Sequence, residues 1–321
     1  MTIQSISLKG LALILLIGCG TAPGQAPARQ RTDPAVAKLG NGFVSNTTKV
    51  NGTTLYYVRG GTGPPLILIH GFPQDWYEFH HVMPSLAKKF MVIAVDLRGI
   101  GRSAATPSGY DAATMAEDIY QLTQHLKLER PYIIGHDIGG SVAYAFVRLH
   151  PKTTSGVMIL ETPIAGLAPW EEIRGDPRLW HIPFHQTPEL PEKLIAGREF
   201  IYLRNFLNRG VLDSKVISDA DVSHYANSYA APDHLHAGME MYRAFPDNEK
   251  FNAAQLVAID VPIVMVGGDH SFGKLLPKVA EALRQHGCAS VSIEIINNSA
   301  HYVFEEKPEA VAELIERYAS P

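Results

Sequence analysis

The stretch YIIGHDIGGS, residues 132–141, decides how the rest of the chain is interpreted. An apolar run leads into Gly135-His136-Asp137, and a helix-like segment begins after Gly140. This glycine spacing is typical of a sharp turn between a strand and a helix, because bulky side chains there would clash with the turn or the sheet. Such a turn presents its middle residue, here Asp137, at the tip, where a nucleophile is needed.

An aspartate at this tip predicts different chemistry from a serine. The N-terminus of the following helix favours an anion, so we expect Asp137 to be ionised at neutral pH. A carboxylate displaces a leaving group at an sp³ carbon and forms an alkyl-enzyme ester, which water then cleaves. Attack on an amide or ester would instead give an anhydride, a poor route. The alternative is that Asp137 only caps the following helix.

Two further loops contain residues that support the interpretation of Asp137 as a nucleophile. LIHGFPQ, residues 68–74, follows an apolar run, and we predict an oxyanion hole formed by the backbone N–H groups of Phe72 and Ile138. NNSAHYVFEEKPEAV, residues 297–311, places His301 in a loop after the last predicted strand, where a general base is needed. By contrast, we expect His70 and His136 to be structural.

The acidic partner of His301 has two candidates. Glu161 follows an apolar run in MILETP, and Asp269 follows another in VGGDHSF. Either carboxylate could orient the imidazole and stabilise its cation, since both lie just past a predicted strand.

Short apolar runs alternate with helix-like segments, which predicts an α/β fold with a mostly parallel sheet between helices. The alternation stops over residues 168–257, which we interpret as a helical cap over the carboxyl ends of the strands. The core is therefore predicted at 42–167 and 258–321. The predicted strands are 54–59, 66–70, 92–96, 132–136, 157–160, 263–267 and 292–296, and the predicted core helices are 76–88, 114–126, 141–150, 275–286 and 308–319.

The N-terminus predicts export. Residues 1–19 have the form of a signal peptide that ends in LIGC, which resembles a bacterial lipobox and makes Cys19 the expected lipid anchor. Residues 20–41 read as a flexible tether rich in Pro, Gly and Ala. We therefore expect a secreted, periplasmic or outer-membrane lipoprotein. The alternative is an ordinary signal peptide, cut near GQAPA without lipidation.

Composition excludes several classes of function. The chain of 321 residues has a net charge of −4 and no basic run, which argues against nucleic acid as the main partner. It has two cysteines, too few for a disulfide framework or a cysteine-rich zinc site.

Together with VDLRGIGRS, residues 95–103, these motifs resemble the α/β-hydrolase superfamily in its epoxide hydrolase and haloalkane dehalogenase branch. Haloalkane dehalogenases usually carry Trp after the nucleophile, and fluoroacetate dehalogenases usually carry Arg. This chain has Ile138, which favours the epoxide hydrolases.

The cap segments LWHIPFHQTPELPEKLIAGREFIYLRNFL (179–207) and GMEMYRAF (238–245) resemble the Cif-like epoxide hydrolases. The resemblance implies that Asp137 is the nucleophile and that His301 is the base. It further implies that Glu161 is the acid of the triad, and that His181 and Tyr242 are the groups that protonate the epoxide oxygen. His185, four residues after His181, is the competing histidine in the cap.

The expected reaction is the opening of a small apolar epoxide to a vicinal diol. It needs neither a metal nor an organic cofactor, because the nucleophile belongs to the protein. Related enzymes often form homodimers, which we also expect here. The alternatives are a haloalkane or haloacid dehalogenase with the same nucleophile, and an exported effector or binding protein on a hydrolase fold.

Overall fold

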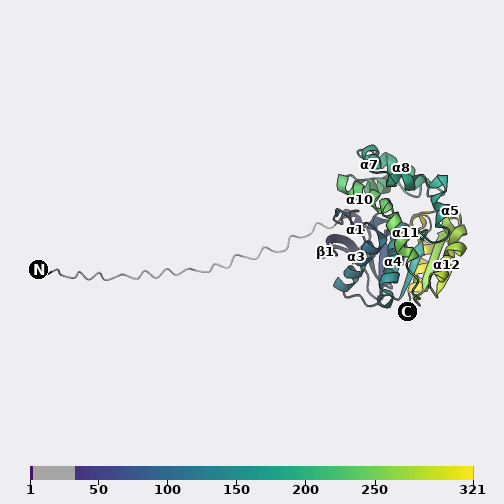
Figure 1. The fold of residues 1–321 in the computed structure, drawn as a ribbon, viewed down its shortest axis with the longest axis horizontal. Coiled ribbons are helices and arrows are strands. Elements are labelled where there is room, and N and C mark those ends of the chain that lie inside the picture. Colours follow the sequence, from purple (N-terminus) through teal and green to yellow (C-terminus); the bar gives the residue numbers. More distant parts are fainter. Residues whose placement is uncertain (3–32, 321) are drawn as a thin grey trace. The chain divides into compact units, whose positions relative to one another are not determined.

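The computed structural model describes residues 1–2 and 33–320 (Figure 1). The predicted lipid anchor Cys19 and almost all of the predicted signal peptide lie outside the described residues, as does the tether up to residue 32. None of the described helices has the length and apolar character needed to cross a membrane.

The predicted tether is too long at its C-terminal end. Helix α1, Pro34–Lys38, lies inside the range predicted as tether, and its residues Ala35 and Val36 are buried. The Asp33 side chain accepts a hydrogen bond from the Ala35 N–H at 2.9 Å and caps the helix. Composition alone could not predict this helix, because alanine and proline occur both in the first turn of a capped helix and in a flexible tether.

Within residues 33–320 the strands form one eight-stranded sheet in the order β1-β2-β4-β3-β5-β6-β7-β8. Strands β3 to β8 are parallel, and β2 pairs antiparallel with both β1 and β4. This confirms the predicted α/β class with a mostly parallel sheet. The strands are β1 (Val44–Val50), β2 (Thr53–Gly60), β3 (Pro65–Ile69), β4 (Met91–Val95), β5 (Tyr132–His136), β6 (Gly156–Leu160), β7 (Ile263–Gly268) and β8 (Val291–Ile296).

The central strands were predictable because they are buried on both faces. Every residue of β5, β6 and β7 is buried, so each strand is a continuous apolar or small-residue run. Strand β1 was not predicted. Its sequence, VSNTTKV, is mostly polar, and it lies at the edge of the sheet with several exposed side chains.

The core helices follow the predicted segments, with one division. The helix predicted at 76–88 is a 3-10 turn, η1, and a short helix, α2, separated by residues 80–82. The core elements are η1 (Trp76–Phe79), α2 (Met83–Leu86), α3 (Ala112–His125), α4 (Ile138–Leu149), η2 (Pro151–Thr153), η4 (Phe272–Leu275), α12 (Leu276–Gln285), α13 (Val303–Glu306) and α14 (Pro308–Ala319).

The segment between β6 and β7 is helical, as predicted for the cap. In Figure 1, α7, α8 and α10 of this segment lie at the top, whereas α5 and α11 lie lower in the view. The cap elements are α5 (Trp170–Arg174), η3 (Pro177–Leu179), α6 (His181–Gln186), α7 (Leu190–Ile195), α8 (Glu199–Asn208), α9 (Asp219–Ser228), α10 (Pro232–Arg243) and α11 (Phe245–Ala253).

Candidate active site

The turn at Asp137 is as sharp as its glycines predict. Asp137 joins β5 to α4 with φ 52° and ψ −120°, a strained backbone conformation for a residue other than glycine. A Cβ on Gly139 would lie 2.2 Å from the Ile69 carbonyl oxygen, and one on Gly135 would lie 2.1 Å from the Gly139 carbonyl oxygen. The tight packing of β3, β5 and α4 therefore fixes the position of the carboxylate.

The two oxygens of the Asp137 carboxylate have different surroundings. Oδ1 accepts a hydrogen bond from the Phe72 N–H at 3.0 Å, and Oδ2 lies 3.6 Å from Nε2 of His301. Ile138 is buried and is the first residue of α4, a position whose N–H has no intrahelical acceptor. Both predicted oxyanion donors therefore lie beside Asp137, and that of Phe72 already donates to it.

His301 lies between two carboxylates. Its Nδ1 is 3.2 Å from Oε2 of Glu161, whose side chain is buried. Glu161 is itself held in place, because its Oε1 accepts from the Gly268 N–H at 2.6 Å and its Oε2 accepts from the Ser271 hydroxyl. A carboxylate at Nδ1 favours the tautomer with hydrogen on Nδ1, which leaves the Nε2 lone pair facing Asp137.

Asp269, the other candidate acid, lies apart from this arrangement. Its Oδ1 accepts from the Ser299 N–H at 3.1 Å, and its nearest ion-pair partner is the exposed His270 at 3.9 Å. The Ser299 and Asn298 N–H groups hold the pKa of Asp269 below its usual value. Within the described residues it forms no hydrogen bond or ion pair with His301, so the structure brings Glu161, and not Asp269, to the imidazole.

The histidines next to the two loops are bonded within the core. His70 accepts from the Leu97 N–H at Nε2, 3.0 Å away, and its Nδ1 is 3.0 Å from the Gly71 carbonyl oxygen. Nδ1 of His136 is 2.7 Å from Oε1 of Glu78, and Nε2 of His136 is 2.9 Å from the His301 carbonyl oxygen. Hydrogen bonds hold the His70 ring, and one hydrogen-bond partner and one ion pair hold the His136 ring, in line with structural roles.

Glu78 was not singled out from the sequence, where it stands among aromatic residues in WYEF without a motif. Besides approaching His136, its Oε2 accepts from the Gly71 N–H at 3.2 Å. One buried ion pair therefore connects the loop that carries Phe72 to the loop that carries His301. Burial disfavours the His136 cation, but the Glu78 carboxylate outweighs this effect and raises the pKa of His136 to about 9.

This ion pair predicts a loss of stability in alkaline solution. A histidine whose folded-state pKa is about 9, against about 6.5 when unfolded, stabilises the fold fully below pH 6.5 and loses that effect as the pH rises through 9. At about 1.4 kcal/mol for each pH unit between the two values, the change is on the order of 3 kcal/mol. The test is urea unfolding of the wild type and of His136→Gln between pH 6 and pH 10. Their difference in unfolding free energy should shrink over that range, and parallel curves would contradict the prediction.

His181 and Tyr242 come together in the cap. His181 begins α6, Tyr242 lies near the end of α10, and their ring centroids are 5.9 Å apart. The ring of Tyr242 also packs edge-on against Phe72, with centroids 5.3 Å apart. Within the described residues, neither the imidazole of His181 nor the hydroxyl of Tyr242 forms a hydrogen bond with another group. Both remain available to a substrate.

Burial sets the protonation of this pair. It lowers the pKa of His181 to about 4, the Asp137 carboxylate opposing this in part, so the ring is neutral at pH 7. It raises the pKa of Tyr242 well above its usual value, so the phenol keeps its proton. A neutral imidazole and a protonated phenol each offer one hydrogen-bond donor.

His185, the competing histidine, has a different environment. It is fully buried, and its Nε2 is 2.5 Å from the Tyr202 hydroxyl. Burial lowers its pKa to about 2. Its ring lies among Phe72, Phe206 and Tyr242. His185 therefore belongs to the apolar packing that surrounds the site, and His181 is the histidine with a free ring.

The cap also contacts the loop of His301 directly. The carbonyl oxygen of Gly210 accepts from the His301 N–H at 2.8 Å and from the Tyr302 N–H at 3.2 Å. A Cβ on Gly210 would lie 2.5 Å from the Tyr302 ring. Sequence reasoning missed this residue, because a lone glycine after a helix usually marks only its end.

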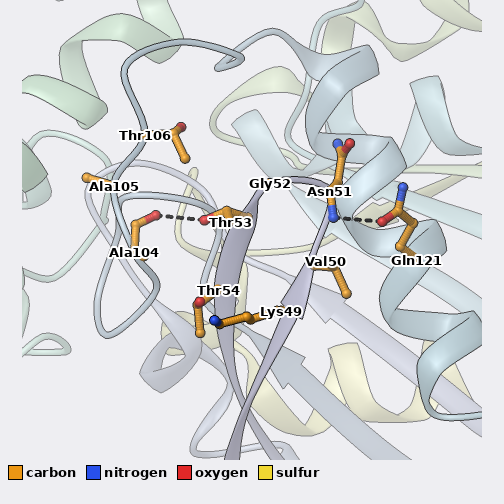
Figure 2. Close-up of a pocket in the computed structure, with 10 residues that line it drawn as sticks. All are labelled: Lys49, Val50, Asn51, Gly52, Thr53, Thr54, Ala104, Ala105, Thr106 and Gln121. Carbon is orange, nitrogen blue, oxygen red and sulfur yellow. Dashed lines mark hydrogen bonds between the residues drawn. The ribbon is translucent and has the colours of Figure 1, made fainter.

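A separate hollow lies at the turn between β1 and β2 (Figure 2). There the Thr53 hydroxyl donates to the Ala104 carbonyl at 2.9 Å, and the Gln121 side chain accepts from the Asn51 N–H at 2.6 Å. None of the residues that line it is a predicted site residue, and its polar groups are partly paired with one another. We therefore place the candidate active site at Asp137 and not in this hollow.

The sheet, the elbow and the loops together define an α/β hydrolase. The family model described as alpha/beta hydrolase fold matches residues 64–308, and the chain belongs to this family. This confirms the fold class expected from the motifs.

Similar proteins with named activities include an epoxide hydrolase and a dehalogenase. The chain is 34% identical over 281 residues to the soluble epoxide hydrolase of Corynebacterium sp., covering 85% of this chain and 96% of that one. It is 32% identical over 212 residues to the fluoroacetate dehalogenase of a Burkholderia species, covering 63% and 69% of the two chains. Both expected branches are thus represented among its relatives.

Solved structures agree with this placement. Cfl2 from Burkholderia cenocepacia is 34% identical, with a TM-score of 0.83 over 90% of this chain and 99% of that one. The Cif epoxide hydrolase from Acinetobacter nosocomialis, 23% identical, shares the fold with a TM-score of 0.77 over 87% and 90% of the two chains. The relative from Corynebacterium confirms the resemblance to the epoxide hydrolases, and the Cif enzyme shares the fold of this chain.

Proposed function

We propose that this protein is an epoxide hydrolase that converts a small apolar epoxide to a vicinal diol. The observation that carries the proposal is the pair His181 and Tyr242, two free proton donors in the cap above a carboxylate nucleophile. A ring oxygen must gain a proton as its C–O bond breaks, whereas a departing halide needs none. The kinship with the soluble epoxide hydrolase of Corynebacterium supports the same assignment.

The first step forms an ester. Oδ2 of Asp137 attacks the less hindered ring carbon, a C–O bond of the ring breaks, and the released oxygen takes a proton from Tyr242 or His181. Oδ1 stays with the Phe72 N–H and becomes the carbonyl oxygen of the ester. The aromatic rings around Phe72 keep the site apolar, which favours a charged nucleophile meeting a neutral substrate away from bulk water.

The second step cleaves the ester and restores the enzyme. Nε2 of His301 takes a proton from a water molecule, which attacks the carboxyl carbon of Asp137. The negative charge that develops on Oδ1 is stabilised by the N–H groups of Phe72 and Ile138. When the C–O bond of the ester breaks, the leaving alkoxide takes the proton of the hydroxyl group that water added to the carboxyl carbon, and the diol departs from the restored carboxylate. The proton on His301 then replaces the one that the cap donated. Glu161 stabilises the imidazolium in the interval.

Intact-protein mass spectrometry of His301→Gln, mixed with an epichlorohydrin, tests the proposal. This variant lacks the base whichever carboxylate orients it, so the ester should accumulate on Asp137. Epichlorohydrin offers both an epoxide and a halogen. An adduct that keeps chlorine, and that is absent from Asp137→Asn, is the expected result. No adduct with either protein would contradict the proposed nucleophile.

The second candidate function is dehalogenation, which the kinship with a fluoroacetate dehalogenase favours. In that case the same experiment gives an adduct that has lost its chlorine, because the halide and not the ring oxygen leaves. Release of halide by the wild type from fluoroacetate or a chloroalkane would support the same conclusion.

Removing the proton donors should slow ring opening. We expect Tyr242→Phe and His181→Phe each to lower kcat by roughly 10²-fold or more, because the departing oxygen loses a donor. Tyr202→Phe is the matched control, since that hydroxyl bonds to His185. Its kcat should stay within about threefold of the wild type. Steady-state diol formation measures all three, and equal effects at Tyr202 and Tyr242 would refute the assignment.

Export is a further part of the proposal. The signal-like segment 1–19 and the cysteine at its end support an exported protein, whether secreted, periplasmic or an outer-membrane lipoprotein. Labelling of cells with a radioactive fatty acid, comparing the wild type with Cys19→Ala, tests lipidation directly. Label retained by the variant would contradict it.

A further inference from the structure

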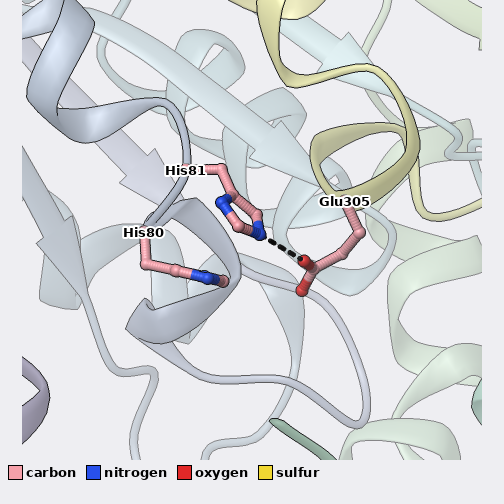
Figure 3. A group of neighbouring side chains, drawn as sticks. All are labelled: His80, His81 and Glu305. Carbon is pink, nitrogen blue, oxygen red and sulfur yellow. Dashed lines mark ion pairs between the residues drawn. The ribbon is translucent and has the colours of Figure 1, made fainter. Parts of the chain in front are cut away.

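Three side chains from two distant parts of the chain meet outside the proposed active site. His80 and His81 follow η1, and Glu305 lies in α13 (Figure 3). One nitrogen of each imidazole and one oxygen of Glu305 all lie within 4.8 Å of one another. Two imidazoles and a carboxylate are the ligand set of many zinc sites, which take three protein ligands and a water molecule.

The first imidazole is held ready for a metal. Nδ1 of His80 is 2.7 Å from the Tyr77 carbonyl oxygen, and its ring stacks on that of Tyr77 with centroids 4.0 Å apart. The carbonyl requires hydrogen on Nδ1, so the lone pair is on Nε2. A metal-binding histidine characteristically donates its other ring N–H to such an acceptor, which fixes both the tautomer and the ring orientation.

One oxygen of the Glu305 carboxylate has no hydrogen-bond partner in the described part of the chain and lies near the imidazole of His81. Oε1 of Glu305 accepts from the Tyr225 hydroxyl at 2.8 Å and from the Gln74 side-chain amide at 3.0 Å. Its Oε2 is buried, has no hydrogen bond to any described residue, and lies 3.7 Å from Nε2 of His81. A buried oxygen without a partner is costly, and a cation bound there would remove the cost.

We propose that His80, His81 and Glu305 bind a divalent transition metal, with zinc as the best match. Imidazole and carboxylate suit zinc, and its bonds of about 2.0–2.2 Å require ligand atoms roughly 3.3 Å apart. The three side chains must therefore close slightly from separations that reach at most 4.8 Å. His81 is the side chain free to move, because nearly half of it is exposed.

The expected consequence is stabilisation of the active-site loops and not a role in the chemistry. His80 and His81 follow the loop that carries Phe72, and Glu305 follows the loop that carries His301. A metal between them would connect the two loops. Binding to the folded state alone raises the midpoint of thermal unfolding.

Zinc binding by the purified protein tests the inference. Equilibrium dialysis with ZnSO₄ measures stoichiometry and affinity for the wild type, His81→Asn and, as a matched control, His125→Asn at an exposed histidine in α3. We expect the wild type and His125→Asn to bind one zinc ion more tightly than His81→Asn by about 10²-fold or more. Zinc should also raise the unfolding midpoint of the first two proteins only.

Glu305→Gln is the second variant, because an amide keeps an oxygen for Tyr225 and the fold but removes the ligand charge. It too should lose the site. Equal zinc affinity in all four proteins would overturn the proposal and leave His81 and Glu305 as a simple ion pair. None of these outcomes depends on turnover, so the result is independent of the proposed function.

Discussion

The Asp137→Asn variant is expected to lose essentially all turnover of epoxides. The amide has the shape of the carboxylate, and its oxygen can still accept from the Phe72 N–H that now lies 3.0 Å from Oδ1. It is not a nucleophile, so no ester forms. Removal of the nucleophile from a hydrolase triad costs on the order of 10⁶ in kcat, and we expect a fall of about 10⁴ to 10⁶ here.

The control for this variant is the same substitution at another helix N-terminus. Asp111 caps α3 by accepting from the Thr114 N–H at 2.9 Å, and Asp111→Asn keeps a good capping residue. If Asp137 were only a cap, both variants would retain activity and differ little in stability. Diol formation measures the activities, and peptide mass mapping confirms that each amide persists. Turnover of Asp137→Asn within tenfold of the wild type would refute the role of nucleophile.

The parts of this fold that could be predicted are those that burial dictates. β5 is predicted to the residue, because a strand covered on both faces must be apolar throughout and its end is marked by the elbow glycines. β1 could not be predicted, since an edge strand with exposed side chains tolerates a polar sequence such as VSNTTKV. Helix α1 could not be predicted either, because its five residues, PAVAK, are too few to show the periodicity of a helix.

The residues of the candidate site also differ in whether the sequence alone predicts them. Asp137 is visible in the sequence because glycines mark its turn, and His301 because its loop follows the last predicted strand. Glu78 and Gly210 are not, since each acts through contacts with residues far along the chain, His136 for Glu78 and His301 for Gly210. Periodicity carries no information about such contacts. The choice between Glu161 and Asp269 is of this kind too, because both follow strands that end at the same edge of the sheet.

Substitution of the two acids should therefore give very different results. Glu161→Gln is expected to lower kcat by about 10³ to 10⁴-fold, the loss found when an amide replaces the acid of a triad. The amide would present an N–H to Nδ1 of His301, now 3.2 Å from Oε2. This forces hydrogen onto Nε2, so the ring cannot take a proton from water. Asp269→Asn should stay within about twofold, since Asp269 bonds to the Ser299 N–H and not to the imidazole of His301, and the amide oxygen can still accept that bond.

The timing of the defect in Glu161→Gln distinguishes a lost base from a disturbed fold. Ring opening uses Asp137 and the cap donors and does not need His301 as a base, so the ester should still form at a rate close to that of the wild type. Rapid mixing followed by intact-mass measurement should show the adduct rising quickly and persisting. A variant with a distorted elbow would instead form the adduct slowly. An adduct that persists in Asp269→Asn, and not in Glu161→Gln, would reverse the assignment of the acid.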